Sequence, residues 1–276
     1  NGEMVTKFPI AMGSPITAAS LDRSERRLLT GAHDGKVRIW NFNSGVMMSD
    51  FPRQVKEVTS VACIPHGRFI HRPVVAAGWD RNVVMCADVQ EGEEVPDPVT
   101  LVGHKADILC LEVCDSRSHS EGSSQLLVCS GDADGNVMMW VASNGRLECH
   151  FTPLQLGKGS RDKAAVGDSP MSSLAPERSG SGGGALAQKD GAVFSLHHLA
   201  AHDCLLVGVA SGHVHAISLW ANRDKFCTVD PDIFDDEPAP GSIDENTPVS
   251  SLSLGQTPDA PSCIASNATG TRVFIG

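Results

Sequence analysis

The residues best suited to chemistry in this sequence are aspartates and histidines grouped over short distances. Asp132 and Asp134 flank one alanine and precede Gly135, which is the spacing of the first ligands of a calcium-binding loop. Such a loop also needs a glycine at its sixth position and a glutamate at its twelfth. Counted from Asp132, the sequence has Val137 and Ser143 there. We therefore interpret the run as a tight turn between two strands.

Histidines gather in the last third of the chain, at His197, His198, His202, His213 and His215. His213 and His215 would point to the same face of a strand, which makes a zinc site one interpretation. Zinc sites of this kind usually combine histidines with closely spaced cysteines, and the sequence has no such spacing. We favour histidines that lie at the surface or are satisfied by hydrogen bonds.

No arrangement of residues points to catalysis. The sequence has no G-x-S-x-G motif, and its segment SGSGGGALAQ lacks the lysine of a phosphate-binding loop. Nine cysteines form no C-x-x-C pair and lie mostly in apolar runs, which is typical of reduced core cysteines in a cytosolic protein. We expect a non-enzymatic protein without catalytic, cofactor-binding or metal-binding residues.

Charge and hydropathy argue against two classes of partner. The formal net charge is −11, and no run of lysine and arginine is long enough to attract nucleic acid. No apolar run approaches the roughly 20 residues of a membrane-spanning helix. We expect neither a nucleic-acid nor a membrane partner, and a cytoplasmic location.

A repeat indicates how the candidate residues are positioned. Three segments align, TGAHDGKVRIW at 30–40, AGWDRNVVMC at 77–86 and SGDADGNVMMW at 130–140. Each has a glycine, a nearby aspartate, and a large or soft apolar residue six positions after the aspartate. These residues are Gly31, Asp34 and Trp40, then Gly78, Asp80 and Cys86, then Gly131, Asp134 and Trp140. Short apolar runs around such turns predict β-hairpins.

A second element recurs in phase with the first. GEMVTKF, GVMMSDF and GRLECHF each place a phenylalanine six residues after a glycine. With an apolar strand before each hairpin, the pattern predicts four-stranded antiparallel blades of roughly 40–45 residues, and hence an all-β propeller. We expect blades at 16–51, 58–101 and 104–151, a degenerate blade at 192–229 and an incomplete one at 248–276. Residues 1–10 match only a last strand, so we expect a partial propeller that begins and ends within blades.

On these residues the chain resembles the WD-repeat family. In that family a hydrogen-bonded tetrad stiffens each blade, and it consists of a histidine, a serine or threonine, an aspartate and a tryptophan. These side chains bond to one another because buried polar groups need partners. The resemblance implies such a tetrad from His104, Ser130, Asp134 and Trp140.

The other two units match the tetrad in part. Thr30, Asp34 and Trp40 occupy the matching positions of the first unit, which lacks the histidine. The second unit has Asp80, with Cys86 in place of the tryptophan.

A narrower resemblance comes from RPVVAAGWDRNVVMCADV at 72–89. It is similar to a blade of the large WD-repeat proteins of cilia and flagella, and the extra Trp79 before Asp80 carries the similarity. It implies a structural or docking component of the axoneme, in a cilium or flagellum, with microtubule-associated proteins or tubulin as partners. The alternative is a soluble cytosolic adaptor, such as a substrate receptor in a multiprotein complex.

Two insertions interrupt the repeat, at 152–191 and 230–247. The second is strongly acidic and contains Asp230, Asp232, Asp235, Asp236, Glu237, Asp244 and Glu245. We expect both insertions to be mobile and to connect the last strand of one blade with the first strand of the next. That placement would put them on the face that carries Asp34, Asp80 and Asp134. The acidic loop is a candidate site for a basic protein partner, and a solvated loop without a role is the alternative.

Overall fold

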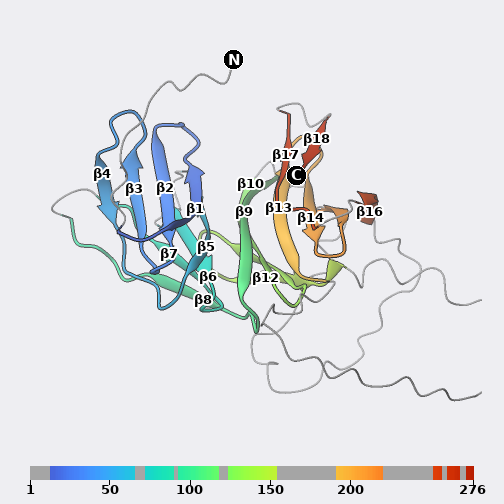
Figure 1. Cartoon of the computed structure of the whole chain (residues 1–276), viewed down its shortest axis with the longest axis horizontal. Helices are drawn as coiled ribbons and strands as arrows, with labels where there is room; N and C mark the ends of the chain where they lie inside the picture. Colours follow the sequence, from blue (N-terminus) through green and yellow to red (C-terminus); the bar gives the residue numbers. More distant parts are fainter. Residues whose placement is uncertain are drawn as a thin grey trace, which may run out of the picture.

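The computed structural model describes residues 13–65, 72–89, 93–117, 124–153, 191–219, 251–256, 260–267 and 272–276. In this part of the chain, strands form four sheets of four strands and a fifth sheet of two, all antiparallel (Figure 1). The all-β, four-stranded organisation predicted from the sequence is confirmed. Among the described residues, no helix is long and apolar enough to cross a membrane.

Each sheet is built in chain order, with every strand paired to the next one along the sequence. The first sheet contains β1 (Ile16–Leu21), β2 (Arg27–Ala32), β3 (Val37–Asn41) and β4 (Met47–Asp50). The second contains β5 (Val58–Cys63), β6 (Val74–Gly78), β7 (Asn82–Cys86) and β8 (Val99–Val102). The third contains β9 (Ile108–Arg117), β10 (Ser124–Asp132), β11 (Val137–Val141) and β12 (Leu147–Phe151).

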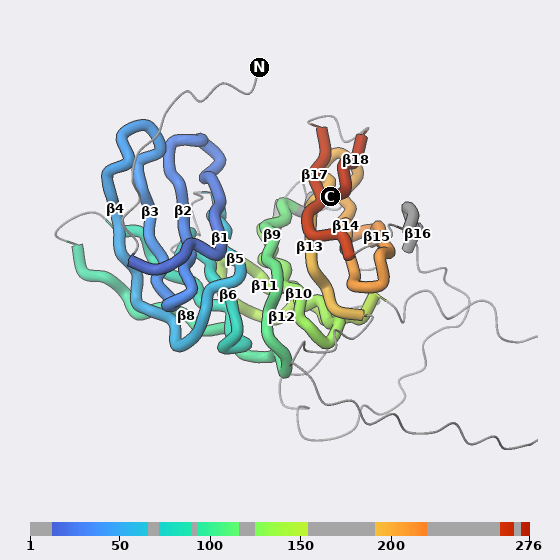
Figure 2. Tube along the Cα trace, viewed as in Figure 1, coloured from blue at the N-terminus to red at the C-terminus, as the bar shows by residue number. Residues whose placement is uncertain are grey.

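The fourth and fifth sheets complete the described part. The fourth contains β13 (Val193–Leu199), β14 (Cys204–Val209), β15 (His213–Ser218) and β16 (Ser251–Gln256), and the fifth contains β17 (Ile264–Ser266) and β18 (Val273–Ile275). The first strands of successive sheets contact each other, β1 with β5, β5 with β9, β9 with β13 and β13 with β17 (Figure 2). Sheets joined through their first strands are arranged as blades around an axis, as in a β-propeller.

Apolar side chains fill the space between neighbouring sheets. Leu29 and Ile39 of the first sheet are buried against Val58 and Val61 of the second. Equivalent buried clusters join the second sheet to the third and the third to the fourth. Because strand residues alternate between two faces, one sheet can contribute to both of its interfaces. The blades are therefore held together by a series of cores between sheets.

The repeated glycine sits beside a first strand, that of the next blade at Gly31 and Gly131 and that of its own blade at Gly78. A Cβ atom at Gly31 would lie 2.5 Å from Cγ1 of Val58, and one at Gly131 would lie 2.5 Å from Cγ1 of Val193. At Gly78 a Cβ atom would lie 1.9 Å from the carbonyl oxygen of Glu57. These separations are shorter than van der Waals contact, so each position requires glycine. At Gly31 and Gly131 the reason is the approach of the next blade, whereas at Gly78 it is the backbone that leads into β5 of the same blade.

The fourth sheet differs from the expected one in its outer strand. β16 pairs with β15, with Ser251 opposite Ile217 and Gln256 opposite His213. Residues 251–256 therefore complete the fourth blade, whereas we expected 248–276 to form a unit of its own. The glycine-to-phenylalanine spacing that marks the last strand of the first and third blades is absent here. Strand pairing uses backbone N–H and C=O groups, which are common to all residues except proline, so the pairing left no signal in the sequence.

This pairing also changes where the acidic segment attaches. Residues 220–250 connect β15 to β16, the third and fourth strands of one sheet, not two successive blades. Ser218, next to this connection, pairs with Cys204, so the segment joins the sheet at the end that carries the turn between β13 and β14. That end is opposite to the turns that contain Asp34, Asp80 and Asp134. The expected connection between two successive blades is thus corrected, while the acidic residues themselves lie outside the described residues.

Candidate functional site

A buried hydrogen-bonded network joins the loop between β8 and β9 to the strands β10 and β11 of the third sheet. His104 Nε2 lies 2.7 Å from Ser130 Oγ, and Trp140 Nε1 donates to the same oxygen over 3.1 Å. His104 Nδ1 lies 2.8 Å from Oδ2 of Asp132. The side chains of His104 and Asp132 are 1% and 0% exposed. Each buried polar group has a partner, which is the condition for burying it at low cost.

The aspartate of this network is Asp132, and the assignment to Asp134 is corrected. Asp132 ends β10, so its carboxylate reaches His104 across the blade. Its Oδ1 accepts from the backbone N–H of Asp134 over 3.0 Å and from that of Asn136 over 2.8 Å. Asp134 lies two residues beyond the strand, within the turn, and is exposed.

The charge of Asp132 is stabilised by its neighbours. Burial alone would raise the pKa of this carboxyl, but hydrogen bonds from His104 and from the backbone and side chain of Asn136 outweigh burial and lower the pKa. Asp132 therefore remains an anion that ties the loop at His104 to the turn at Asn136. The arrangement stiffens the blade.

The first blade contains a shorter version of the network. Trp40 Nε1 donates to Thr30 Oγ1 over 2.8 Å, and both residues are buried. Asp34 does not join this pair. It accepts from the backbone N–H of Lys36 over 3.3 Å and pairs with the Lys36 ammonium over 3.8 Å. Asp34 thus shapes the turn between β2 and β3.

The second blade uses its aspartate in the same way. Asp80 Oδ1 accepts from the backbone N–H of Asn82 over 3.3 Å. Cys86, at the position of the tryptophan, is a buried core residue, and burial raises the pKa of its thiol to about 11. In these two blades, therefore, the repeated aspartate forms a turn rather than a polar tetrad.

The histidines of the fourth blade lie among ordinary polar contacts. His197 Nε2 is 2.9 Å from Ser266 Oγ, and His213 Nδ1 is 3.1 Å from Ser211 Oγ. The rings of His213 and His215 are stacked with centroids 6.2 Å apart. His202 lies in the turn after β13, where its backbone N–H donates to Leu199.

Burial lowers the pKa of three of these histidines, and it is the largest cause for each of them: His197, His198 and His215. Within the ranges that the structure describes, no three His, Cys, Asp or Glu side chains lie close enough to hold a metal ion. The histidine cluster therefore does not assemble a zinc site in this part of the molecule.

The candidate acidic partner-binding loop lies outside the described residues, and so does the expected strand at 1–10. Of the insertion at 152–191, only its ends are described. These ends follow β12 and precede β13, so the insertion joins the third blade to the fourth.

Comparison with known proteins is consistent with this architecture. Residues 3–41 and 98–141 match the model of the WD domain, G-beta repeat. The second match contains His104, Ser130, Asp132 and Trp140, the residues of the buried network. The antiparallel blades and the two matched segments are similar to the repeats of the WD-repeat family.

Relatives with similar sequences share about half of the chain. A "WD repeat-containing protein on Y chromosome" of Drosophila pseudoobscura pseudoobscura is 39% identical over 135 residues, covering 48% of this chain and 11% of the relative. The protein of the same name in Drosophila mojavensis is 36% identical over 133 residues, covering 48% of this chain and 10% of the relative. The chain thus spans only a small part of the length of these relatives, and their names do not mention cilia or flagella.

Proposed function

We propose that this chain is a structural or docking component of the axoneme of a cilium or flagellum, acting as a non-enzymatic scaffold. The observation that carries the proposal is the turn after β6. Trp79 lies in this turn and is 43% exposed. Its backbone N–H donates to the carbonyl of Glu57 over 3.2 Å, which fixes the backbone at this position. Tryptophan is enriched among the residues that dominate binding energy at protein interfaces.

The neighbouring contacts hold this turn in place. Arg81 has a positive φ of 66° and its Nε lies 3.5 Å from Oδ1 of Asp107, in the loop that leads into the third blade. Asp80 caps the same turn through Asn82. An exposed aromatic ring on a fixed backbone loses little conformational freedom when a partner covers it. The same residues carry the similarity to the ciliary WD-repeat proteins, and axonemal microtubule-associated proteins or tubulin are the proposed partners.

A soluble cytosolic adaptor fits the same architecture equally well. Loops extend from both ends of rigid blades, which suits the assembly of several proteins into one complex. The two functions differ in how the protein is retained in the cell. An axonemal component stays bound to microtubules at high salt, whereas an adaptor leaves with its soluble complex.

Salt extraction of the full-length native protein from its own cells, with mass spectrometry of the bound material, tests the proposal. Retention with tubulin through high salt is the expected result, and release in a soluble complex would favour the adaptor. Trp79→Ala should weaken retention. Phe42→Ala is the matched control, since Phe42 is 41% exposed and follows β3 at the other end of its sheet. Recovery of the protein without any associated protein would contradict both scaffold functions.

A further inference from the structure

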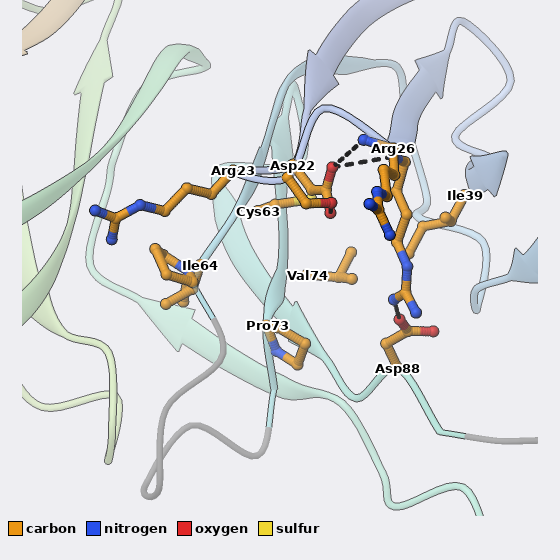
Figure 3. A pocket seen from close by; sticks show the side chains of 12 residues that line it. Asp22, Arg23, Arg26, Ile39, Cys63, Ile64, Pro73, Val74 and Asp88 are labelled. Atoms are coloured by element: carbon orange, nitrogen blue, oxygen red, sulfur yellow. Dashed lines mark hydrogen bonds and ion pairs between the residues drawn. The ribbon is translucent and has the colours of Figure 1, made fainter. Parts of the chain in front are cut away.

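A cavity opens between the first and second blades, at the end that carries the β1–β2 turn (Figure 3). Its volume is about 480 Å³. It lies at the opposite end of the blades from Trp79 and the turns with the repeated aspartates. It is therefore separate from the surface discussed above.

The floor of this cavity is apolar. Ile39, Ile64 and Val74 line it, and each is only 2% exposed as a residue. Pro73 stands at its edge (Figure 3). Cys63 adds to the apolar surface, because burial, followed by the carboxylates of Asp22 and Asp88, raises the pKa of its thiol to about 11. Such a floor favours an apolar side chain over water.

Both carboxylates at the cavity already have partners. Asp88 pairs with Arg27 at 2.5 Å and accepts from Ser49 Oγ over 2.9 Å. Asp22 accepts from the backbone N–H groups of Arg26 and Arg27 over 2.9 and 3.0 Å, and from Ser24 Oγ over 2.7 Å. These bonds lower the pKa of Asp22 although burial, the largest cause, acts to raise it.

Two arginines remain for a ligand. Arg23 and Arg26 are exposed, and among the described residues neither guanidinium makes a hydrogen bond or an ion pair. They extend on opposite sides of Asp22 (Figure 3). The cavity thus holds three arginines against two carboxylates, in a chain with a formal net charge of −11. The bonds to Asp22 fix the backbone of the turn that presents both arginines, so only the two side chains are ordered on binding.

We propose that this cavity, the Arg23/Arg26 groove, binds an acidic peptide segment of a partner protein that carries an apolar residue between carboxylates. Guanidinium groups recognise carboxylates through paired N–H donors. Because the two arginines diverge, they fit two separate carboxylates on either side of the apolar residue, which enters the floor. This inference rests on the proposed scaffold function, and it specifies the chemistry of one partner.

The test uses the full chain and arrayed synthetic decapeptides with one Leu, Ile, Phe or Met flanked by Asp and Glu. Binding of the best peptides is then measured by fluorescence polarisation. Peptides with Asn and Gln in place of the acids, or Ser in place of the apolar residue, are the ligand controls. We expect acidic–apolar peptides to bind at least about tenfold more tightly than either control, since both the ion pairs and the floor contribute.

Two double variants distinguish binding by the Arg23/Arg26 groove from the effect of the protein's net charge. R23E/R26E should weaken binding at least about tenfold, because it replaces attraction by repulsion at both carboxylates. K56E/K105E makes the same change of net charge on exposed lysines at the other end of the blades and should leave binding within about twofold. Equal binding of acidic and neutral peptides, or equal loss in both variants, would overturn the proposal. The scaffold function is assessed separately by the extraction experiment, so either can fail alone.

Discussion

Replacing Asp132 by alanine should destabilise the protein much more than the same replacement at Asp134. The Asp132 carboxylate accepts from His104, from two backbone N–H groups and from the side chain of Asn136. Its removal leaves the Nδ1 side of His104 buried without an acceptor. Breaking one side of a buried, charge-assisted pair costs about 3–5 kcal/mol. Asp134 is exposed, and its replacement should cost less than about 1 kcal/mol.

Urea unfolding of the full chain, followed by tryptophan fluorescence, measures this difference in the free energy of unfolding. Trp140, one of the four tryptophans, belongs to the same network and contributes to the signal. The lowered pKa of Asp132 sets the sign of the pH dependence. Its stabilising contribution is present above the pKa of the unfolded carboxyl and is lost as the pH falls through the folded pKa.

Acid should therefore narrow the gap between wild type and Asp132→Ala. If Asp134→Ala were as costly as Asp132→Ala at neutral pH, the assignment of the network to Asp132 would be refuted.

Two further predictions concern contacts between blades. Burial raises the pKa of Glu112 to about 7, although a hydrogen bond from the backbone N–H of His198 acts against burial. Stability should therefore fall as the pH rises from about 4.5 through 7. In Glu112→Gln the melting temperature should depend less on pH across that range, and a pH dependence equal to that of the wild type would contradict this. Gly131→Ala should cost about 1–3 kcal/mol in urea unfolding, because its Cβ would meet Val193. Val193→Ala should relieve part of that loss in the double variant, and purely additive effects would argue against the contact.

The sequence was sufficient for the repeat and for the type of fold. Hairpin turns, short apolar strands and a repeated glycine are local features, so they can be recognised from neighbouring residues alone. They predicted the four-stranded sheets, and the structure adds the reason for the glycine, which is the close approach of Val58 or Val193 from the next blade.

The partners of particular side chains could not be predicted in the same way. Asp132 and Asp134 have the same chemistry and stand two positions apart, and the residue order favoured Asp134 by analogy with the repeat. The register of β10 with β9 pairs Asp132 with Ile108, so the end of β10 lies beside the loop of His104 that leads into β9, and this places Asp132 in the network. The only feature of the sequence that could have identified Asp132 as the aspartate of the network is its position at the end of the apolar strand.

What the sequence determined by itself is the repeated pattern of strands and hairpin turns, because strand and turn preferences depend on local residues. Only the tertiary structure decided which strand closes the fourth blade, since β16 joins β15 through backbone hydrogen bonds across a long insertion. The Arg23/Arg26 groove is likewise a tertiary feature. Its arginines belong to the first blade and Ile64 and Val74 to the second, and these residues meet only because β1 packs against β5.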